Sequence, residues 1–133
     1  MRPLLATLLL VLSAAAQSAE FNCTITGASE VTADGKLQAL EGGKNYYETV
    51  SGAEFIVDRD TGQMMGRFVS NSGFRITVVD PGSATNSYKL LSVSPRRGAR
   101  VQSQYFELRL QDKGDKKPFT LVAAEVLHGY CTQ

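Results

Sequence analysis

The sequence is poor in the residues on which metal-dependent and redox enzymes rely. Its 133 residues include one histidine, His128, and two cysteines, Cys23 and Cys131. A structural zinc site takes about four ligands and a hydrolytic triad needs a histidine oriented by a carboxylate, so one histidine argues against both. The cysteines form no C-x-x-C motif, which argues against redox catalysis. We therefore expect no metal, no cofactor and no catalytic residue, with His128 solvated or at the edge of the core.

The chain also lacks an excess of charge of either sign. It holds 14 Lys plus Arg and 13 Asp plus Glu, and without Arg2 the bases number 14 minus 1, or 13. Nucleic acid and anionic membranes select a basic excess, so neither is expected as the main partner. The charges are uneven, because residues 20–60 hold eight acids and three bases while residues 61–133 hold five acids and ten bases.

Long apolar runs are missing after the N-terminus. Arg2 precedes an apolar run at residues 4–12 and small residues at 14–19. This order is typical of a secretory signal peptide, and the apolar run is too short to span a membrane. We therefore assign residues 1–19 to a signal peptide.

Two cleavage positions fit this segment, one after Ala16 and one after Ala19. Either leaves about 115 residues, enough for one domain with a small core. The expectation is a single β domain at 20–133 that is exported, either periplasmic or secreted.

The two cysteines lie near the ends of that domain. In an oxidising compartment they are most simply one disulfide, Cys23–Cys131. In the loop-entropy model, closing so long a loop stabilises the fold by about 4–5 kcal/mol. The bond would make the first and last strands neighbours, and we expect it to join the two ends of the sheet and remove the exposed edges.

The clearest secondary-structure signal is a hairpin at residues 54–68. Phe55 and Val57 alternate with polar residues, as in a half-buried strand. The turn-forming residues 59–63 follow, with Gly62 free to take a positive φ, and an apolar segment resumes at Met64.

No later window has a helical period, and strand patterns alternate with polar turns. The expected strands are 21–25, 30–32, 36–40 after an Asp34-Gly35 turn, 46–50, 74–78, 87–94, 100–111 and 119–127, with a loop at 80–86. The fold class is therefore all-β, a single antiparallel meander forming a barrel or sandwich of about eight strands, closed by one disulfide. The period of two predicts a buried core of Phe55, Val57, Phe74, Ile76, Phe106, Leu108 and Leu110.

Four segments carry a resemblance. VDRDTGQMMG, PGSATNSYKL, YFELRL with KKPF, and the terminal GYCT resemble small exported bacterial proteins of unknown function. The resemblance covers most of residues 54–132. It implies export and a compact β fold, and it implies no activity.

A calcium loop is the competing interpretation of residues 58–62, because D-x-D spacing begins an EF-hand loop. The third ligand position holds Gly62 and the twelfth holds Val69 in place of glutamate. We instead expect a hairpin turn in which Asp58 or Asp60 accepts bonds from backbone N–H groups.

The densest charge in the chain is basic, at Arg96, Arg97 and Arg100. These guanidiniums are either solvated turn charges or a docking site for an unknown protein or other acidic ligand. Because turns of a meander alternate between its two ends, the arginines should lie at the end opposite Lys113, Lys116 and Lys117.

The favoured function is an exported, non-enzymatic binding or inhibitor-like module. The alternative is a carrier that holds an apolar small molecule in a barrel interior, for which small residues such as Gly66, Ala123 and Ala124 would leave room. A hydrolase is the third hypothesis. No sequence feature indicates the oligomeric state.

Overall fold

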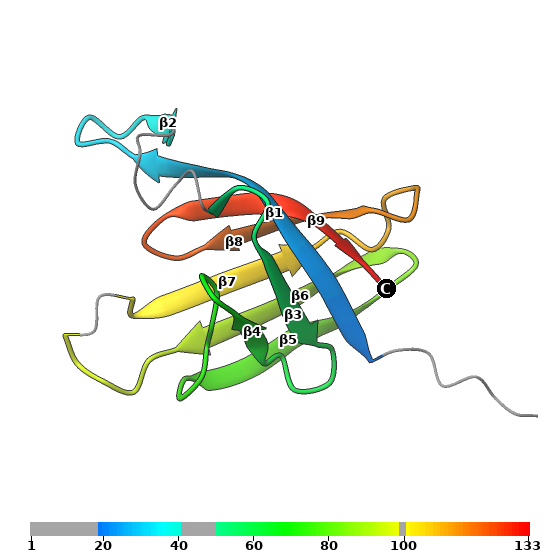
Figure 1. The fold of residues 1–133 in the computed structure, drawn as a ribbon. Helices are drawn as coiled ribbons and strands as arrows, with labels where there is room; N and C mark the ends of the chain where they lie inside the picture. Colours follow the sequence, from blue (N-terminus) through cyan, green and yellow to red (C-terminus); the bar gives the residue numbers. More distant parts are fainter. Residues whose placement is uncertain (1–18, 41–49, 99–100) are drawn as a thin grey trace, which may run out of the picture.

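A computed structural model describes residues 19–40, 50–98 and 101–133. The regular elements of these residues are nine strands (Figure 1). In chain order they are β1 (Glu20–Val31), β2 (Leu37–Ala39), β3 (Glu54–Asp58), β4 (Met64–Gly66), β5 (Arg75–Ser83), β6 (Asn86–Val93), β7 (Ser103–Leu108), β8 (Lys117–Val122) and β9 (Val126–Thr132). The signal peptide predicted at 1–19 and the strand predicted at 46–50 lie almost entirely outside the described residues.

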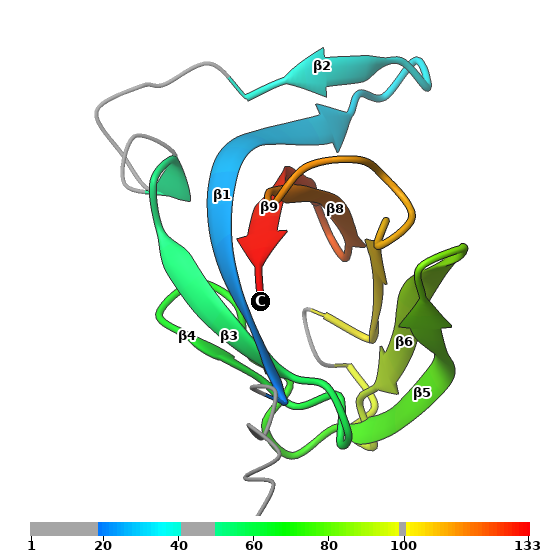
Figure 2. The same ribbon diagram turned by 90° about the vertical axis from the view of Figure 1, so that its right-hand side faces the viewer.

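The strands form one antiparallel sheet in the order β4-β3-β1-β9-β8-β7-β6-β5, with β2 paired to β1 outside this path. Figure 2 shows the sheet curling round into an incomplete barrel. This confirms the prediction of an all-β antiparallel fold of about eight strands. Among the described strands the two edges, β4 and β5, do not pair with each other.

The predicted disulfide is confirmed. Cys23 and Cys131 are bonded across 108 residues with an S–S distance of 2.00 Å, and they are direct partners in the β1–β9 ladder. The first and last strands are therefore neighbours, as predicted. The expectation that the bond joins the ends of the sheet is wrong, because β1 pairs with β9 on one side and with β3 on the other. The disulfide thus lies in the middle of the sheet.

The single strand predicted at 119–127 is also wrong. The chain turns between β8 and β9, where the N–H of Ala123 donates to the carbonyl of Glu125 at 2.8 Å. The turn residues Ala-Ala-Glu include none of the usual turn formers, so no local signal marks it.

The loop predicted at 80–86 is shorter than expected, because β5 continues to Ser83. A register shift between Val78 and Asp80 accommodates the extra residue, and Pro81 follows it. Proline cannot donate to a ladder, and it is tolerated here because β5 is an edge strand.

Strand alternation builds the core. Five of the seven predicted core residues are buried, namely Phe55, Val57, Phe106, Leu108 and Leu110. Phe74 and Ile76 were predicted to be buried but are only half-buried. They lie just before and within β5, which has a neighbouring strand on one side only.

Aromatic rings fill the centre of the curl. The Phe106 ring contacts those of Phe55, Tyr88 and Phe119 at centroid distances of 6.2, 6.3 and 5.6 Å. Phe21 meets the Tyr88 ring edge-on at 5.1 Å. Such pairs contribute about 0.5–1.5 kcal/mol each beyond the area they bury. Phe106 takes part in three of them, so its ring should contribute strongly to stability.

Side chains connect the two edges that no ladder joins. The fully buried Asn71 accepts a bond from the N–H of Met64 at 2.7 Å, and its Nδ2 donates to the carbonyl of Gly62 and to Ser92 Oγ, each at 2.9 Å. This links the β3–β4 hairpin to β6. We call these contacts, together with the three described next, the seam.

Three further contacts belong to the seam. The Tyr88 hydroxyl donates to the carbonyl of Arg59 at 3.1 Å, and the Arg59 guanidinium donates to the carbonyl of Pro81 at 3.3 Å. Gly62, with φ of 75°, lies so close to β5 that a Cβ there would come within 2.8 Å of Ile76. The turn therefore needs glycine both for its backbone angle and for the close approach.

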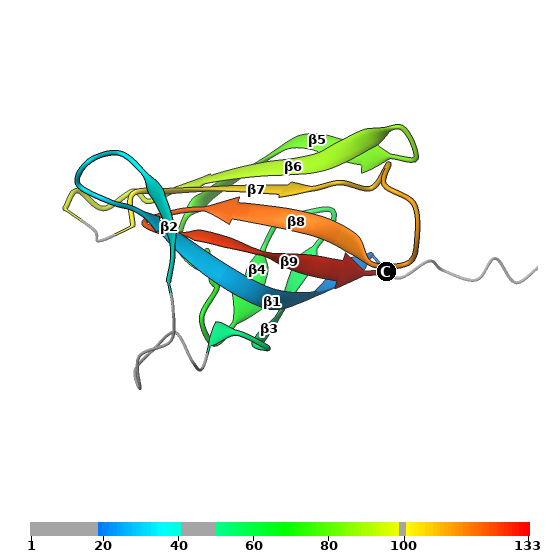
Figure 3. The same ribbon diagram turned by 90° about the horizontal axis from the view of Figure 1, so that it is seen from above.

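Because neighbouring strands are antiparallel, the connections alternate between two ends, as Figure 3 shows. The β3–β4, β5–β6 and β7–β8 connections share one end. The β4–β5, β6–β7 and β8–β9 connections share the other, and the tip of the β1–β2 hairpin projects there. The predicted separation from Lys113, Lys116 and Lys117 is therefore confirmed for Arg96 and Arg97, while Arg100 lies outside the described residues.

Candidate functional site

The turn that carries Arg96 and Arg97, which we call the arginine turn, connects β6 to β7. The N–H of Ser94 donates to the carbonyl of Gln102 at 2.8 Å, and the N–H of Arg96 donates to Ser94 Oγ at 3.2 Å. Arg96 and Arg97 are exposed, and within the described residues neither forms an ion pair. Arg100 lies outside the described residues. The structure thus presents two free guanidiniums to solvent at one end of the sheet.

The turn at residues 58–62 holds its acidic residue by backbone bonds, as expected. Asp58 Oδ1 accepts from the N–H groups of Thr61 at 2.8 Å and Asp60 at 3.0 Å. The bond from Thr61 is the main reason that the pKa of Asp58 lies below its usual value.

In the part of the chain that the structure describes, no three histidine, cysteine or acidic side chains gather as a metal site would require.

His128 is exposed on β9, as expected, and its ring covers Gly27, where a Cβ would come within 2.6 Å of the imidazole. The side chain at its Nδ1 is the Thr26 hydroxyl, at 3.5 Å. Across β7, β8 and β9 the register aligns Glu107, Thr120 and His128 beside a shallow hollow of about 380 Å³. Since strands are about 4.8 Å apart, the backbones of Glu107 and His128 are about 10 Å apart. Thr120 lies between them, so this row does not place the Glu107 carboxylate against the imidazole of His128.

The small residues that suggested room for a ligand do not line an interior space. Ala123 and Ala124 lie in the β8–β9 turn. Gly66 faces Phe55 across the β3–β4 ladder, so closely that a Cβ on Gly66 would lie 2.5 Å from that of Phe55. These residues therefore give the carrier hypothesis no support.

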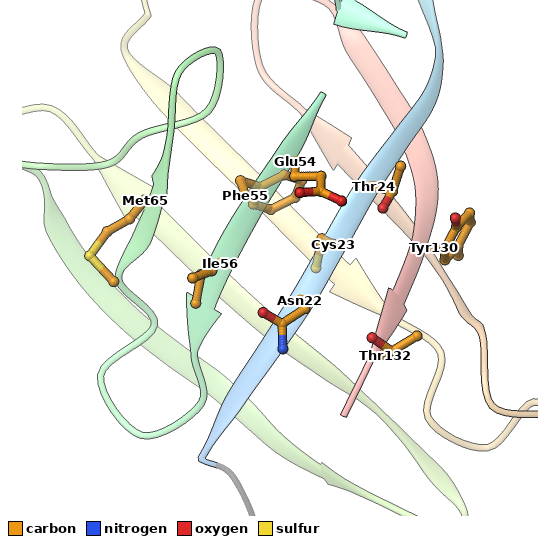
Figure 4. A pocket seen from close by; sticks show the side chains of 9 residues that line it. All are labelled: Asn22, Cys23, Thr24, Glu54, Phe55, Ile56, Met65, Tyr130 and Thr132. Carbon is orange, nitrogen blue, oxygen red and sulfur yellow. The ribbon is translucent and has the colours of Figure 1, made fainter. Parts of the chain in front are cut away.

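A second hollow, of about 350 Å³, lies on the outer face of four adjacent strands (Figure 4). The register builds it from two rows. The first row is Glu54, Thr24 and Tyr130, from β3, β1 and β9, and the second is Met65, Ile56, Asn22 and Thr132, from β4, β3, β1 and β9. Phe55 and the disulfide lie beneath them. We call this the outer hollow.

Sequence reasoning missed the outer hollow. Glu54 is one of the polar residues that alternate with Phe55 and Val57. Such an outward polar residue carries no local signal of which strands will lie beside its own. The strands concerned are separated by up to about a hundred residues, and only the pairing of β1 with both β3 and β9 brings them together.

In the described ranges no helix is long and apolar enough to span a bilayer. Comparisons of the chain with models of protein families, with curated proteins and with solved structures give no match. The assignment of a function therefore rests on the fold, the arginine turn and the outer hollow.

Proposed function

We propose that the protein is an exported, non-catalytic binding module that docks an acidic partner through Arg96, Arg97 and Arg100. The observation that carries the proposal is the exposure of Arg96 and Arg97 with no ion-pair partner in the described part of the chain. A guanidinium fork pairs well with carboxylates and phosphates, and it is free to do so here.

Two features of the fold support this proposal. A disulfide in the middle of the sheet is compatible with an oxidising compartment outside the cytoplasm. The turn is also carried by β6 and β7, both of which pair on two sides, so strand pairing fixes the base of the docking surface.

The test is capture of the partner from the envelope fraction of the source cells, followed by association kinetics over a series of salt concentrations. Replacing all three arginines with serine should slow association about tenfold at low salt, with the difference fading at high salt. The melting temperature should stay nearly unchanged, because exposed turn charges contribute little to stability.

The matched control replaces Lys113, Lys116 and Lys117 with serine. It removes the same charge from the opposite end of the sheet and should slow association much less. Equal rates for wild type and the arginine variant at every salt concentration would contradict the proposal. Co-purification of a lipid, with no protein partner, would favour the carrier.

A further inference from the structure

The outer hollow owes its shape to the side chains on its central strand. β1 lies between β3 and β9, and its outward residues here are the short Asn22 and Thr24. The flanking strands carry the longer Ile56, Met65 and Tyr130. Short residues therefore form the floor of the hollow and long ones its walls. Its volume of about 350 Å³ is at the lower end of the range for binding pockets, about 300–1,000 Å³.

Recognition in the outer hollow depends on side chains. The main chain of β1 is paired on both sides, so its N–H and C=O groups are already committed. The polar side chains on offer are the Glu54 carboxylate, the Asn22 amide and the hydroxyls of Thr24, Tyr130 and Thr132. Of these only the carboxylate is charged, and it can only accept hydrogen bonds.

The charges select a cation and orient it. Glu54 is exposed, and no Lys or Arg in the described residues lies within ion-pair distance of it. On the other side of the hollow, the Lys116 ammonium covers the Tyr130 ring at 4.3 Å from its centroid. A second cation is repelled from that side and attracted to Glu54. The apolar wall next to Glu54 is formed by the half-buried Ile56 and by Met65, which is 44% exposed.

We propose that the outer hollow binds a lysine or arginine side chain from an extended segment of a partner protein. The cation pairs with Glu54, and the methylene stem lies along Ile56 and Met65. Long basic side chains combine these two properties, since they bury an apolar stem while keeping the charge in water. An amino sugar has no such stem. This site is separate from the arginine turn and selects the opposite charge.

The test is an amide NMR titration of the intact oxidised protein with the probe N-acetyl-lysine methylamide. Saturable shifts should appear at the amides of Asn22, Thr24, Glu54 and Ile56, with a dissociation constant on the order of 10 mM. The norleucine analogue, which keeps the stem and lacks the charge, should bind more weakly. Glu54→Gln should weaken lysine binding about twofold to fivefold, as expected for an exposed ion pair.

Glu30→Gln is the matched control, because Glu30 is an exposed acid on the far part of β1 and its loss changes the net charge equally. It should leave the titration unchanged. Equal binding of the norleucine and lysine probes, an unchanged affinity in Glu54→Gln, or no saturation up to about 50 mM would overturn the proposal. Shifts with glucosamine and none with the lysine probe would assign the hollow to an amino sugar instead. No envelope partner is used, so these outcomes are independent of the arginine turn.

Discussion

At the scale of single residues, buried polar side chains determine how the open side of the barrel is held. Asn71 is fully buried, and both ends of its amide are hydrogen-bonded to groups of the β3–β4 hairpin and β6. A buried polar group left without a partner costs about 1–3 kcal/mol, so these bonds are expensive to break. Tyr88 acts in the same way, with its ring in the aromatic core and its hydroxyl on the Arg59 carbonyl.

Tyr88 should make stability depend on alkaline pH. Burial, with a smaller effect of the Asp58 carboxylate, raises the pKa of its hydroxyl from 10.0 to about 12. Because the folded pKa lies above the unfolded one, this stabilisation is complete below pH 10.0 and is lost as the pH rises towards about 12. Urea unfolding at about pH 8 and about pH 11 should show a smaller loss of stability for Tyr88→Phe than for wild type.

The phenylalanine variant should also lose about 1 kcal/mol at neutral pH, where only the hydrogen bond is missing. Tyr130→Phe controls for the loss of one tyrosine, since its side chain is half-buried on the outer face. An alkaline loss that is the same in wild type and Tyr88→Phe would show that another group unfolds the protein at high pH.

At the scale of strands, position in the sheet decides how much a hydrophobic side chain contributes. Phe106 and Phe74 are the same residue type in equally clear alternating patterns. β7, which carries Phe106, has neighbours on both sides, whereas Phe74 leads into the edge strand β5. The first is fully buried and the second is half-buried.

Truncation of these two phenylalanines should therefore have unequal effects. Phe106→Ala should cost about 3–5 kcal/mol of unfolding free energy, the range for emptying a core aromatic site. Phe74→Ala should cost about 1–2 kcal/mol, because its ring is only partly removed from water. Chemical denaturation of both variants measures the difference. Similar losses would mean that Phe74 is buried as completely as Phe106.

At the scale of the whole molecule, the disulfide ties together segments that the sheet already pairs. Replacing both Cys23 and Cys131 with alanine should lower the unfolding free energy, by up to about 4–5 kcal/mol in the loop-entropy model. The native strand order should persist, because eleven further residues of β1 and six of β9 stay within their strands. Denaturant melts of wild type and the double variant give the cost, and a variant that melts like wild type would contradict it.

The bond itself has a direct check. Denatured wild-type protein should react with no thiol reagent until reductant is added, because both of its cysteines are in the disulfide. Labelling of Cys23 and Cys131 without reductant would show that the bond is absent from the protein.

The whole molecule also places its two candidate surfaces apart. The arginine turn lies at one end of the sheet, while the outer hollow lies on the outer face of β1, β3, β4 and β9. Counting only partners among the described residues, the first offers cations without an ion pair and the second a carboxylate without one. A partner that contacts both must therefore carry charges of both signs.

The sequence by itself determined what depends on local patterns. Period-two alternation identified most strands, Gly62 marked the central hairpin, and the terminal cysteines implied that the first and last strands are neighbours. The alternation of turns also placed the arginine turn opposite the lysines, because consecutive hairpins must reverse direction. Each of these inferences uses residues that are close in the chain or joined by a covalent bond.

Only the tertiary structure decided which strands became edges and what gathered on each face. The pairing of β3 with the free side of β1 put the disulfide in the middle, left β4 and β5 as edges, and exposed part of Phe74 and Ile76. The same pairing assembled the outer hollow and the seam around Asn71. A period of two says which face a side chain is on, but it does not say which strand lies next to it. That choice is made by contacts between residues far apart in the chain.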